Sequence, residues 1–243
     1  MDNITSIALS RLVAQQRATD VTATNLANAA TPGFHAERLV FSDWLVKTPG
    51  GAPGNTLAFA QDRASYRDGQ PGPMQHTGNP LDLAIGGEGY FSVQTPNGVR
   101  LTRAGNFSLN ASGNIVDMQG NPLLDTNGRP LRLGPTDTDL TISATGSISS
   151  SNGVVGRIGI VAPANPQSMQ SEGSQLFAAG GPTTAVANPQ LAQGAFEGSN
   201  IQPTLELTRM MTDMREFQFT SQLVQAEADR QQSAIDKLTQ TRS

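Results

Sequence analysis

The stretch TNLANAATPGF, residues 24–34, marks the point at which a helical amino-terminal segment has to end. The chain from Ile4 to about Asn28 contains no Gly or Pro and is mostly Ala, Leu, Gln, Arg and Thr, which suits a helix. Pro32 then disfavours helical backbone at the preceding residue, and Gly33 can adopt the positive φ that other residues avoid. We therefore predict a helix that ends near residues 28–30.

One face of this helix repeats at alternating spacings of three and four residues, and it is only half apolar. Two interpretations of its asparagines, Asn25 and Asn28, stay open from spacing alone. A buried Asn on a helical seam costs stability but selects register and partner, whereas the alternative is that both residues cap a helix end in solvent. The positions of this seam are Ile4, Ile7, Arg11, Ala14, Ala18, Val21, Asn25 and Asn28.

The carboxy-terminal segment has a stronger helical period. Pro203 suits the first turn of a helix, where its missing N–H costs nothing, and Glu206 lies where the helix dipole favours a negative charge. We predict a helix from Pro203 to Leu238, roughly 50 Å long. Its seam consists of Leu207, Met210, Met214, Phe217, Ser221, Val224, Ala228, Gln231, Ile235 and Leu238.

Between these helices the chain reads as a linker followed by short strands. Residues 35–75 are punctuated by Pro and Gly and show little periodicity, which indicates an extended linker with a strand or two. From residue 81 onward, alternating apolar residues flank Gly-containing turns, as in YFSVQTPNGVRLTR (90–103) and FSLNASGNIVDM (107–118). Further turns are expected at Asn127-Gly128 and Asn152-Gly153.

The expected fold class is α+β, with long amino- and carboxy-terminal helices that pair as a coiled coil, a central antiparallel all-β domain, and extended linkers. We assign residues 1–30 and 199–243 to a helical, tube-forming domain. Residues 31–76 and 186–198 form an extended connecting region, and residues 77–185 form the β-rich outer domain.

Composition excludes several function classes. The net charge is -4 and the pI about 5.1, without a cluster of Lys or Arg, so nucleic acid and anionic membranes are poor partners. No run approaches the roughly 18 apolar residues that membrane insertion requires, and MDNITSIALSRLVAQQR (1–17) does not resemble a cleaved signal peptide. The absence of Cys excludes disulfides, thiol nucleophiles and Cys-based zinc sites.

No residues carry an enzyme or a metal site. His35 and His76 lie in the presumed linkers without metal-ligand spacing and are expected to be solvent-exposed. GGEGYF (86–91) is a tight turn, because it lacks the features of a phosphate loop, and no GxSxG elbow occurs. Asp137 and Asp139 are expected to be solvated turn residues. We therefore expect no catalytic, cofactor-binding or metal-binding residues.

The opening stretch resembles the amino-terminal signature of the axial proteins of the bacterial flagellum, the rod and hook subunits. That signature runs Ala-Asn-Asn-Leu-Ala-Asn, a short spacer, then Thr-x-Gly-Phe. In this chain Thr24 replaces the first Asn of the pair. The matching positions are Ala23, Asn25, Leu26, Ala27, Asn28, Thr31, Gly33 and Phe34.

Two further stretches resemble the same family. TGNPLDLAIGGEGYFSVQTPNGVRLTRAGNFSLNASGNIV (77–116) is similar to the β-domain motif of rod and hook proteins, and FEGSNIQPTLELTRMMTDMREFQ (196–218) is similar to their carboxy-terminal motif. The latter matches at Glu197, Ser199, Asn200, Glu206, Met210, Arg215 and Phe217 and departs at Phe196, Leu207, Met211 and Gln218, of which only the last loses a charge.

Within the family, MDNITSIALSR (1–11) and YRDGQPGPMQHTGNPLDLAI (66–85) are most similar to proximal rod subunits. A distal rod subunit is the alternative, and a free-standing β-rich binding module a weaker one. The resemblance implies a structural polymer subunit for motility, with other proximal and distal rod proteins, further copies of itself and the export apparatus as partners. It also implies type III export without a cleaved signal and a location in the periplasmic rod of the basal body.

The resemblance further implies that the terminal helices stack on those of neighbouring subunits, with the β domain outward. No cofactor is implied. The assembly-interface residues expected on this basis are Ile4, Ile7, Ala14, Val21, Asn25, Leu26, Asn28, Asn200, Leu207, Met210, Met214, Phe217, Val224, Ala228, Ile235 and Leu238.

Overall fold

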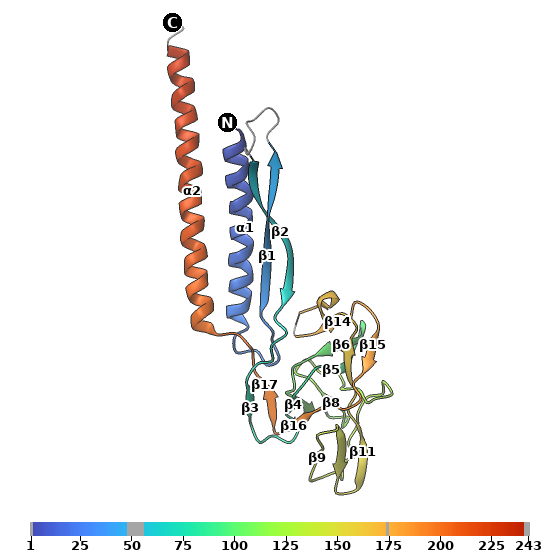
Figure 1. Cartoon of the computed structure of the whole chain (residues 1–243). Helices are drawn as coiled ribbons and strands as arrows, with labels where there is room; N and C mark the ends of the chain where they lie inside the picture. Colours follow the sequence, from blue (N-terminus) through green and yellow to red (C-terminus); the bar gives the residue numbers. More distant parts are fainter. Residues whose placement is uncertain (1, 48–55, 174, 241–243) are drawn as a thin grey trace. The chain divides into compact units, whose positions relative to one another are not determined.

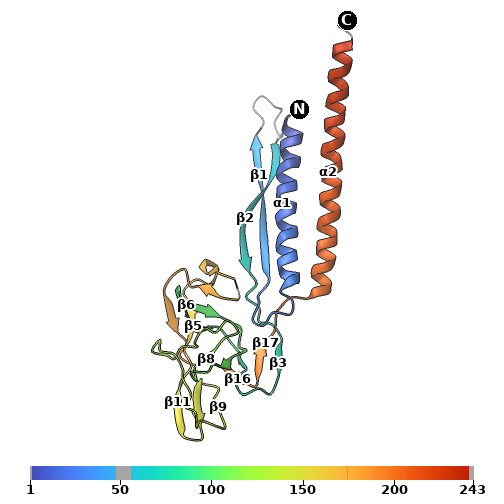
Figure 2. The same ribbon diagram turned by 180° about the vertical axis from the view of Figure 1, so that it is seen from behind.

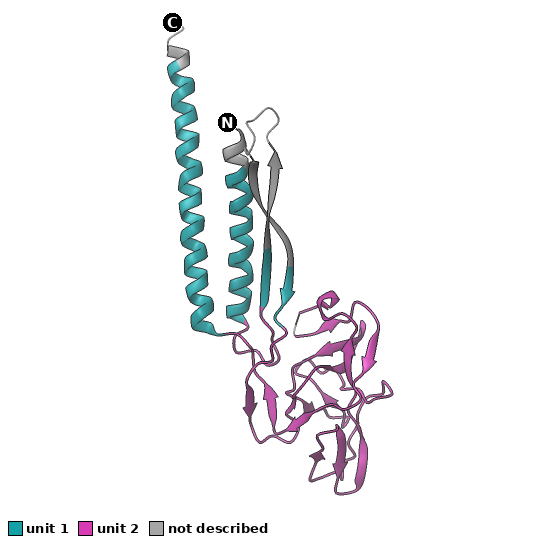
Figure 3. Cartoon of the chain, viewed as in Figure 1, with its two compact units in different colours: residues 1–27, 37–68, 202–243 teal, residues 28–36, 69–201 magenta. Residues whose placement is uncertain are grey.

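The computed structural model describes the backbone of residues 2–47, 56–173 and 175–240. It describes the side chains of the same residues except 2–6, 41–47, 56–64 and 238–240. The chain divides into two compact units (Figure 3). The helical unit comprises residues 1–27, 37–68 and 202–243, and the β unit comprises residues 28–36 and 69–201.

Two long helices form most of the helical unit. Helix α1 spans Asp2–Ala27 (26 residues) and α2 spans Pro203–Gln240 (38 residues). They lie side by side and run in opposite directions, and α2 continues past the first residues of α1 (Figure 1). Both helices were predicted from the absence of Gly and Pro and from the helical period. After α1 the chain turns at Gly33, whose φ of 67° is the positive value expected there.

A long hairpin lies beside α1 in the same unit (Figure 2). Strand β1 (Glu37–Lys47) pairs antiparallel with β2 (Thr56–Arg67), with a register shift between Val40 and Phe41. These strands fall within residues 31–76, which the sequence analysis assigned to an extended connecting region. This segment therefore belongs to the helical unit and forms a hairpin there, although the sequence analysis expected a linker.

The β unit is built from short antiparallel strands. Its largest sheet has 6 strands in the order β13-β14-β6-β5-β12-β15, and smaller sheets of two or three strands complete it. The bounds are β3 Met74–His76, β4 Leu83–Ile85, β5 Tyr90–Thr95, β6 Gly98–Thr102, β7 Ser108–Leu109, β8 Ile115–Val116, β9 Thr141–Ile142, β10 Ser147–Ser150, β11 Gly153–Arg157, β12 Ile160–Pro163, β13 Gln170–Ser171, β14 Phe177–Ala178, β15 Thr183–Ala185, β16 Leu191–Gln193 and β17 Ala195–Glu197, with a 3-10 helix at Pro166–Ser168.

Three successive turns of this unit use one device. In each turn the side-chain oxygen of Asn110, Asp117 or Asp125 accepts hydrogen bonds from the backbone N–H groups two and four residues later. The residue three positions later is a glycine with a φ of 75 to 85°, and its N–H donates to the carbonyl of the first residue. This is why Asx-x-x-Gly segments close the turns here.

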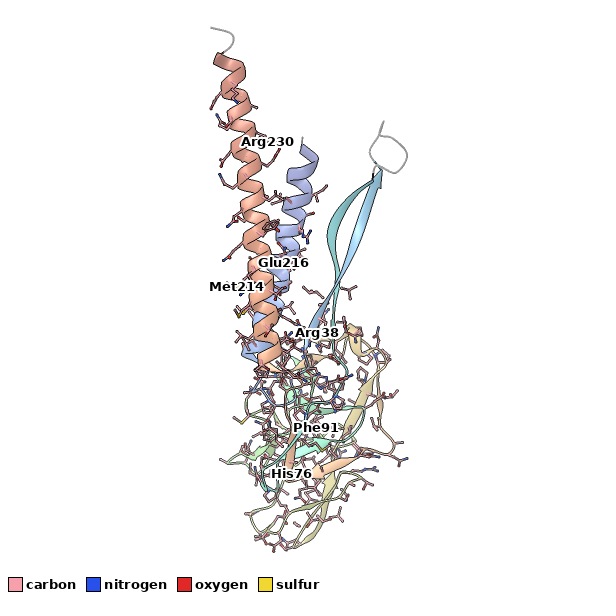
Figure 4. All side chains as sticks on the ribbon, turned by 60° about the vertical axis from the view of Figure 1, so that its left-hand side comes forward. Arg38, His76, Phe91, Met214, Glu216 and Arg230 are labelled. Atoms are coloured by element: carbon pink, nitrogen blue, oxygen red, sulfur yellow. The ribbon has the colours of Figure 1, made fainter. Side chains whose placement is uncertain are left out.

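The core of the β unit lies among β4, β5, β10, β12 and the turns between them. The Phe91 ring meets the Phe107 ring edge-on, with 5.1 Å between centroids (Figure 4 labels Phe91). The buried members of the core are Leu83, Ile85, Phe91, Val93, Phe107, Ile115, Leu123, Leu131, Leu133, Ile142, Ile148, Ile158, Ile160 and Leu191. The alternating apolar positions that predicted the hairpins, such as Phe91 and Val93, therefore supply this core.

Candidate assembly interface

Polar side chains connect α1 to α2 within the helical unit. Gln15 donates from Nε2 to the Glu216 carboxylate at 3.4 Å, and Thr22 donates from Oγ1 to the Asp213 carboxylate at 3.4 Å. Burial raises the pKa of Asp213, and the neighbouring carboxylates of Glu216 and Glu206 add to that rise against the Thr22 hydrogen bond. The contact between the helices is thus partly charged, and it disfavours the ionised form of Asp213.

The face of α2 that is covered recurs at helical spacing. It consists of positions 206, 210, 213, 217, 220, 224, 227 and 231, which are buried or half-buried, and it shares only every second position with the seam read from the sequence. At the remaining positions the structure covers a polar residue and leaves the next residue, which belongs to the predicted seam, exposed; that residue is apolar except at Ser221. Leu207 and Met214 are 49% and 47% exposed, and Figure 4 labels Met214 on α2.

The other expected interface residues fall into three groups. Ala14 and Asn25 are buried, and Ile7, Val21, Leu26, Asn28, Met210, Phe217, Val224 and Asn200 are half-buried. Ala228 and Ile235 are exposed. The side chains of Ile4 and Leu238 lie outside the described residues.

Glu206 occupies the first turn of α2 and is 1% exposed. Its Oε1 accepts from Arg38 on β1 at 2.7 Å and from Arg209 one turn later at 2.8 Å. Its Oε2 has no hydrogen-bond partner among the described residues. The glutamate therefore fixes the start of β1 to the start of α2 through charge-assisted hydrogen bonds. It also lies in the first turn of α2, where the helix dipole favours a negative charge, as the sequence predicted.

Asn25 uses its side chain to bind the backbone of one residue. Its Nδ2 donates to the carbonyl oxygen of Glu37 at 2.8 Å, and its Oδ1 accepts from the N–H of the same residue at 2.9 Å. Asn25 is 1% exposed. Asn25 is therefore a buried asparagine and does not cap the helix in solvent. Within the single chain its side chain binds the first residue of β1 to α1.

Two other asparagines act near the ends of the helices. Asn28 is half-buried and accepts from the Thr31 hydroxyl at 3.2 Å, in the turn that follows α1. Within the β unit, Asn200 accepts from the N–H of Ala36 at 2.8 Å and donates to the carbonyl of Gln70 at 2.8 Å. Asn200 therefore joins three chain segments where they enter and leave that unit.

A buried ionic cluster lies in the β unit around Glu197. The carboxylate bonds to His35 Nε2 at 2.9 Å and accepts from Arg103 at 3.0 Å and from the N–H of Gly72 at 3.0 Å. Burial alone would raise the pKa of Glu197, but the His35 hydrogen bond, the Arg103 charge and the Gly72 bond outweigh it, so the pKa lies below its ordinary value. The expectation that His35 is solvent-exposed was wrong, because the residue is 8% exposed and bonded to this carboxylate.

Gly33 needs the absence of a side chain for a second reason. A Cβ at this position would lie 2.4 Å from the carbonyl carbon of Arg103 within the β unit. Its N–H also donates to the carbonyl of Glu197 at 2.7 Å. The Pro-Gly stop of the opening stretch therefore allows both the positive φ and this close approach.

A groove runs between the two helices of the helical unit. We call it the α1–α2 groove, and its volume is about 440 Å³. Phe219 and Leu223, on its α2 side, are 71% and 51% exposed. Its lining residues are Ile7, Ala8, Arg11, Gln15, Arg215, Glu216, Phe219, Thr220 and Leu223.

The described part of the chain offers little else for chemistry. Within it, acidic and His side chains form no group of three that could hold a metal ion. Of the two helices, as far as they are described, neither has a stretch that is both long and apolar enough to cross a bilayer. The features that remain are the covered and uncovered faces of the terminal helices.

Comparison with known families covers the beginning, the middle and the end of the chain. Residues 6–35 match the family described as flagella basal body rod protein, residues 84–150 match the flagellar hook protein FlgE/F/G D1 domain, and residues 192–237 match the flagellar basal body rod FlgEFG protein C-terminal. A flagellar basal-body rod protein FlgF of Caulobacter vibrioides is 34% identical over 246 residues, covering 98% of both chains.

The chain belongs to the flagellar basal-body rod protein family. Another member, FlgF of Mesorhizobium japonicum, is 34% identical over 96% of both chains. The rod protein FlgG of Bacillus subtilis is 33% identical over 84% of this chain and 87% of its own length. Rod-family proteins are structural components of the flagellar basal body and not enzymes, which confirms the resemblance read from the three sequence motifs.

Sequence reasoning missed three features of this rod-family protein. It assigned Glu206 and Glu197 to family motifs but did not predict their ion-pair partners. Those partners, Arg38 for Glu206 and His35 and Arg103 for Glu197, are distant in sequence. It expected a strand or two in residues 35–75 but did not predict that β1 and β2 form a long hairpin, although the runs ERLVFSDWLVK and TLAFAQDRASYR contain the β-branched and aromatic residues that favour strands. These residues were the available signal.

Proposed function

We propose that this chain is a subunit of the proximal rod and that it polymerises through its terminal helices. The observation that carries this proposal is the similarity to FlgF proteins over nearly the whole chain, at 34% identity and 98% coverage for one of them. The similarity to FlgG proteins, such as that of Bacillus subtilis, supports a distal rod subunit as the second candidate.

The exposed apolar residues of α2 support polymerisation. Leu207, Met211 and Met214 are each about half exposed, and they follow one another at helical spacing. Apolar side chains at such positions favour burial against another helix, and a coiled coil with neighbouring subunits would provide it. The other rod proteins and further copies of this chain are the proposed partners in that coil.

Export completes the proposal. A rod subunit in the periplasm must cross the inner membrane, and similarity to a flagellar rod protein over 98% of the chain favours the export route of the flagellum itself. We therefore assign transport to the flagellar type III export apparatus, in an unfolded state, with a final location in the periplasmic rod.

The test is complementation of a strain that lacks its own copy of the gene. Phe217→Asp places a charge on the half-buried face of α2, and we expect it to abolish swimming and incorporation into isolated basal bodies. Gln222→Asp adds the same charge at an exposed position outside the row of Leu207, Met211 and Met214 and should retain both. Normal swimming of the Phe217→Asp strain would contradict assembly through the paired terminal helices, and failure of the unaltered chain to enter basal bodies would contradict the rod function.

A further inference from the structure

The α1–α2 groove has the dimensions of a binding site for one further helix. Its two walls are formed by residues four apart, Ile7, Arg11 and Gln15 on α1 and Arg215, Phe219 and Leu223 on α2. Each row covers about 12 Å along its helix. Residues spaced by four form the ridges and grooves into which the ridge of another helix packs.

The groove combines an apolar end with a cationic end. Phe219 and Leu223 face Ile7 and Ala8 across it, and Arg215 lies one turn before Phe219. In the part of the chain that the structure describes, neither Arg11 nor Arg215 forms an ion pair. The Glu216 carboxylate, also in the groove, accepts a hydrogen bond from Gln15. A fitting helix should therefore present apolar residues followed by an acidic one.

The opposite face of α1 has that pattern. Leu9 and Val13 are 61% and 51% exposed, and Asp20 follows on the same side of the helix and is exposed. We call these three residues the outer stripe. Leu9 lies two residues after Ile7, so the outer stripe is about half a turn of the helix away from the groove. The Asp20 carboxylate accepts from Gln16 on its own helix at 3.0 Å.

The spacing of residues along the α1–α2 groove also matches their spacing along the outer stripe. Leu9 and Val13 are separated by about 6 Å along the helix, as are Leu223 and Phe219. With Val13 beside Phe219, Asp20 lies about 10 Å further along and Arg215 about 6 Å further along, a difference that the long arginine side chain spans. This match fixes the incoming helix in the direction of the resident α1.

We propose that the α1–α2 groove binds the outer stripe of α1 from a second copy of this chain. The inference rests on the proposed rod function and names the surfaces by which copies meet. Because the groove and the stripe are different surfaces, the contact is head-to-tail, and each added copy presents a new groove and a new stripe. Such a contact gives an open polymer when the rotation between copies does not close it.

The test uses single cysteines, since the chain has none of its own. Full-length Val13→Cys and Phe219→Cys variants, distinguished by tags, are produced together in the strain that lacks its own gene, and isolated basal bodies are oxidised. We expect a cross-linked dimer only when both variants are present. Met211→Cys, 50% exposed but outside the groove, replaces Phe219→Cys as the control and should give none.

Three results would overturn the inference. They are self-linking of Val13→Cys alone, equal linking to Met211→Cys, and no link between Val13→Cys and Phe219→Cys in basal bodies that contain both. In the last case restored swimming shows that the rod function stands. If neither variant nor the unaltered chain enters basal bodies, the rod function itself fails.

A second measurement guards against a variant that does not fold. Phe219→Cys carrying a photoreactive maleimide is irradiated in basal bodies, and the linked peptide is identified by mass spectrometry. A peptide from residues 9–20 of a second copy supports the inference, and a peptide from α2 or from another rod protein overturns it. Asp20→Arg should reduce the link severalfold, and Arg215→Asp in the facing copy should restore it.

Discussion

At the scale of single residues, Glu197 shows how partners from separate chain segments compensate a buried carboxylate. It is 2% exposed, and three separate segments contribute His35, Gly72 and Arg103 to its two oxygens. Breaking a buried pair by removing one partner is costly, because the other charge then stays buried without compensation. The cluster therefore links the stability of the β unit to the ionisation of one residue.

Acid should destabilise the β unit through this carboxylate. The pKa of Glu197 is lowered in the folded state, so its contribution is complete above the unfolded value of about 4.3 and is lost as the pH falls through the folded value. We expect Glu197→Gln to lose about 3 to 5 kcal/mol at pH 7 and to flatten the acid dependence. Chemical denaturation at a series of pH values measures both.

The control for this experiment is Glu172→Gln. Glu172 forms an exposed ion pair with Arg100, and its side chain is 37% exposed. Exposed pairs contribute little to stability, so this variant should behave as the unaltered chain does. A Glu197→Gln variant with the same acid dependence as the unaltered chain would show that another group controls it.

At the scale of elements, the pairing of α1 with α2 is held by polar contacts while apolar side chains stay outside. Gln15 Oε1 and Glu206 Oε2 are buried without a hydrogen-bond partner among the described residues, and Phe219 is 71% exposed. Unpaired buried polar atoms cost stability. The helix pair of a single chain is thus weaker than its length implies, which suits a subunit whose helices gain further contacts on assembly.

Replacing Asp213 should strengthen the helix pair at neutral pH. Burial and two nearby carboxylates raise its pKa in the folded state, so the folded state is favoured below that pKa and loses stability as the pH rises through it. We expect Asp213→Asn to raise the melting temperature of the helices at pH 7 and to have little effect near pH 3, where the aspartate is protonated.

Circular dichroism at 222 nm follows this transition. Asp229→Asn removes an exposed carboxylate of the same helix and serves as the matched control, with no change expected. A gain that persists unchanged at low pH would mean that the effect of Asp213→Asn is not caused by the charge.

At the scale of the whole molecule, the chain contains two units with separate interiors. The β unit has an apolar core that includes Phe91, Leu123 and Ile148, each fully buried. In the described part of the helical unit, Ala8 and Ala14 are buried alongside polar residues such as Asn25 and Glu206. An apolar core and a polar helix contact respond differently to heat and to mutation, so the two units should unfold in distinct steps.

A cavity in the β core tests this separation. Ile148→Ala should cost about 2 to 5 kcal/mol and lower one calorimetric transition only. The single tryptophan, Trp44, belongs to β1 in the helical unit, so its fluorescence transition should not move. Val154→Ala, at a position 75% exposed in β11, is the control. If the fluorescence transition shifts together with the core, the units unfold as one.

The sequence by itself determined the elements that depend on neighbours in the chain. The helix stop at Pro32-Gly33, the start of α2 at Pro203, and the hairpins closed by Asn127-Gly128 and Asn152-Gly153 all follow from local backbone preferences. The three family motifs likewise needed only sequence order. Such features were predictable because a few adjacent residues restrict φ and ψ whatever lies elsewhere.

Only the tertiary structure decided which side chains meet. The covered face of α2 differs from the seam read from the sequence at every second position. Asp213, for example, is half-buried, although the helical period had predicted that Met214 would be the covered residue. It also joined Asn25 to Glu37, and Glu197 to His35 and Arg103. Helical spacing gives the relative angle of residues on one helix, but the face turned inward depends on partners distant in the chain, and their positions are set by packing of the entire unit.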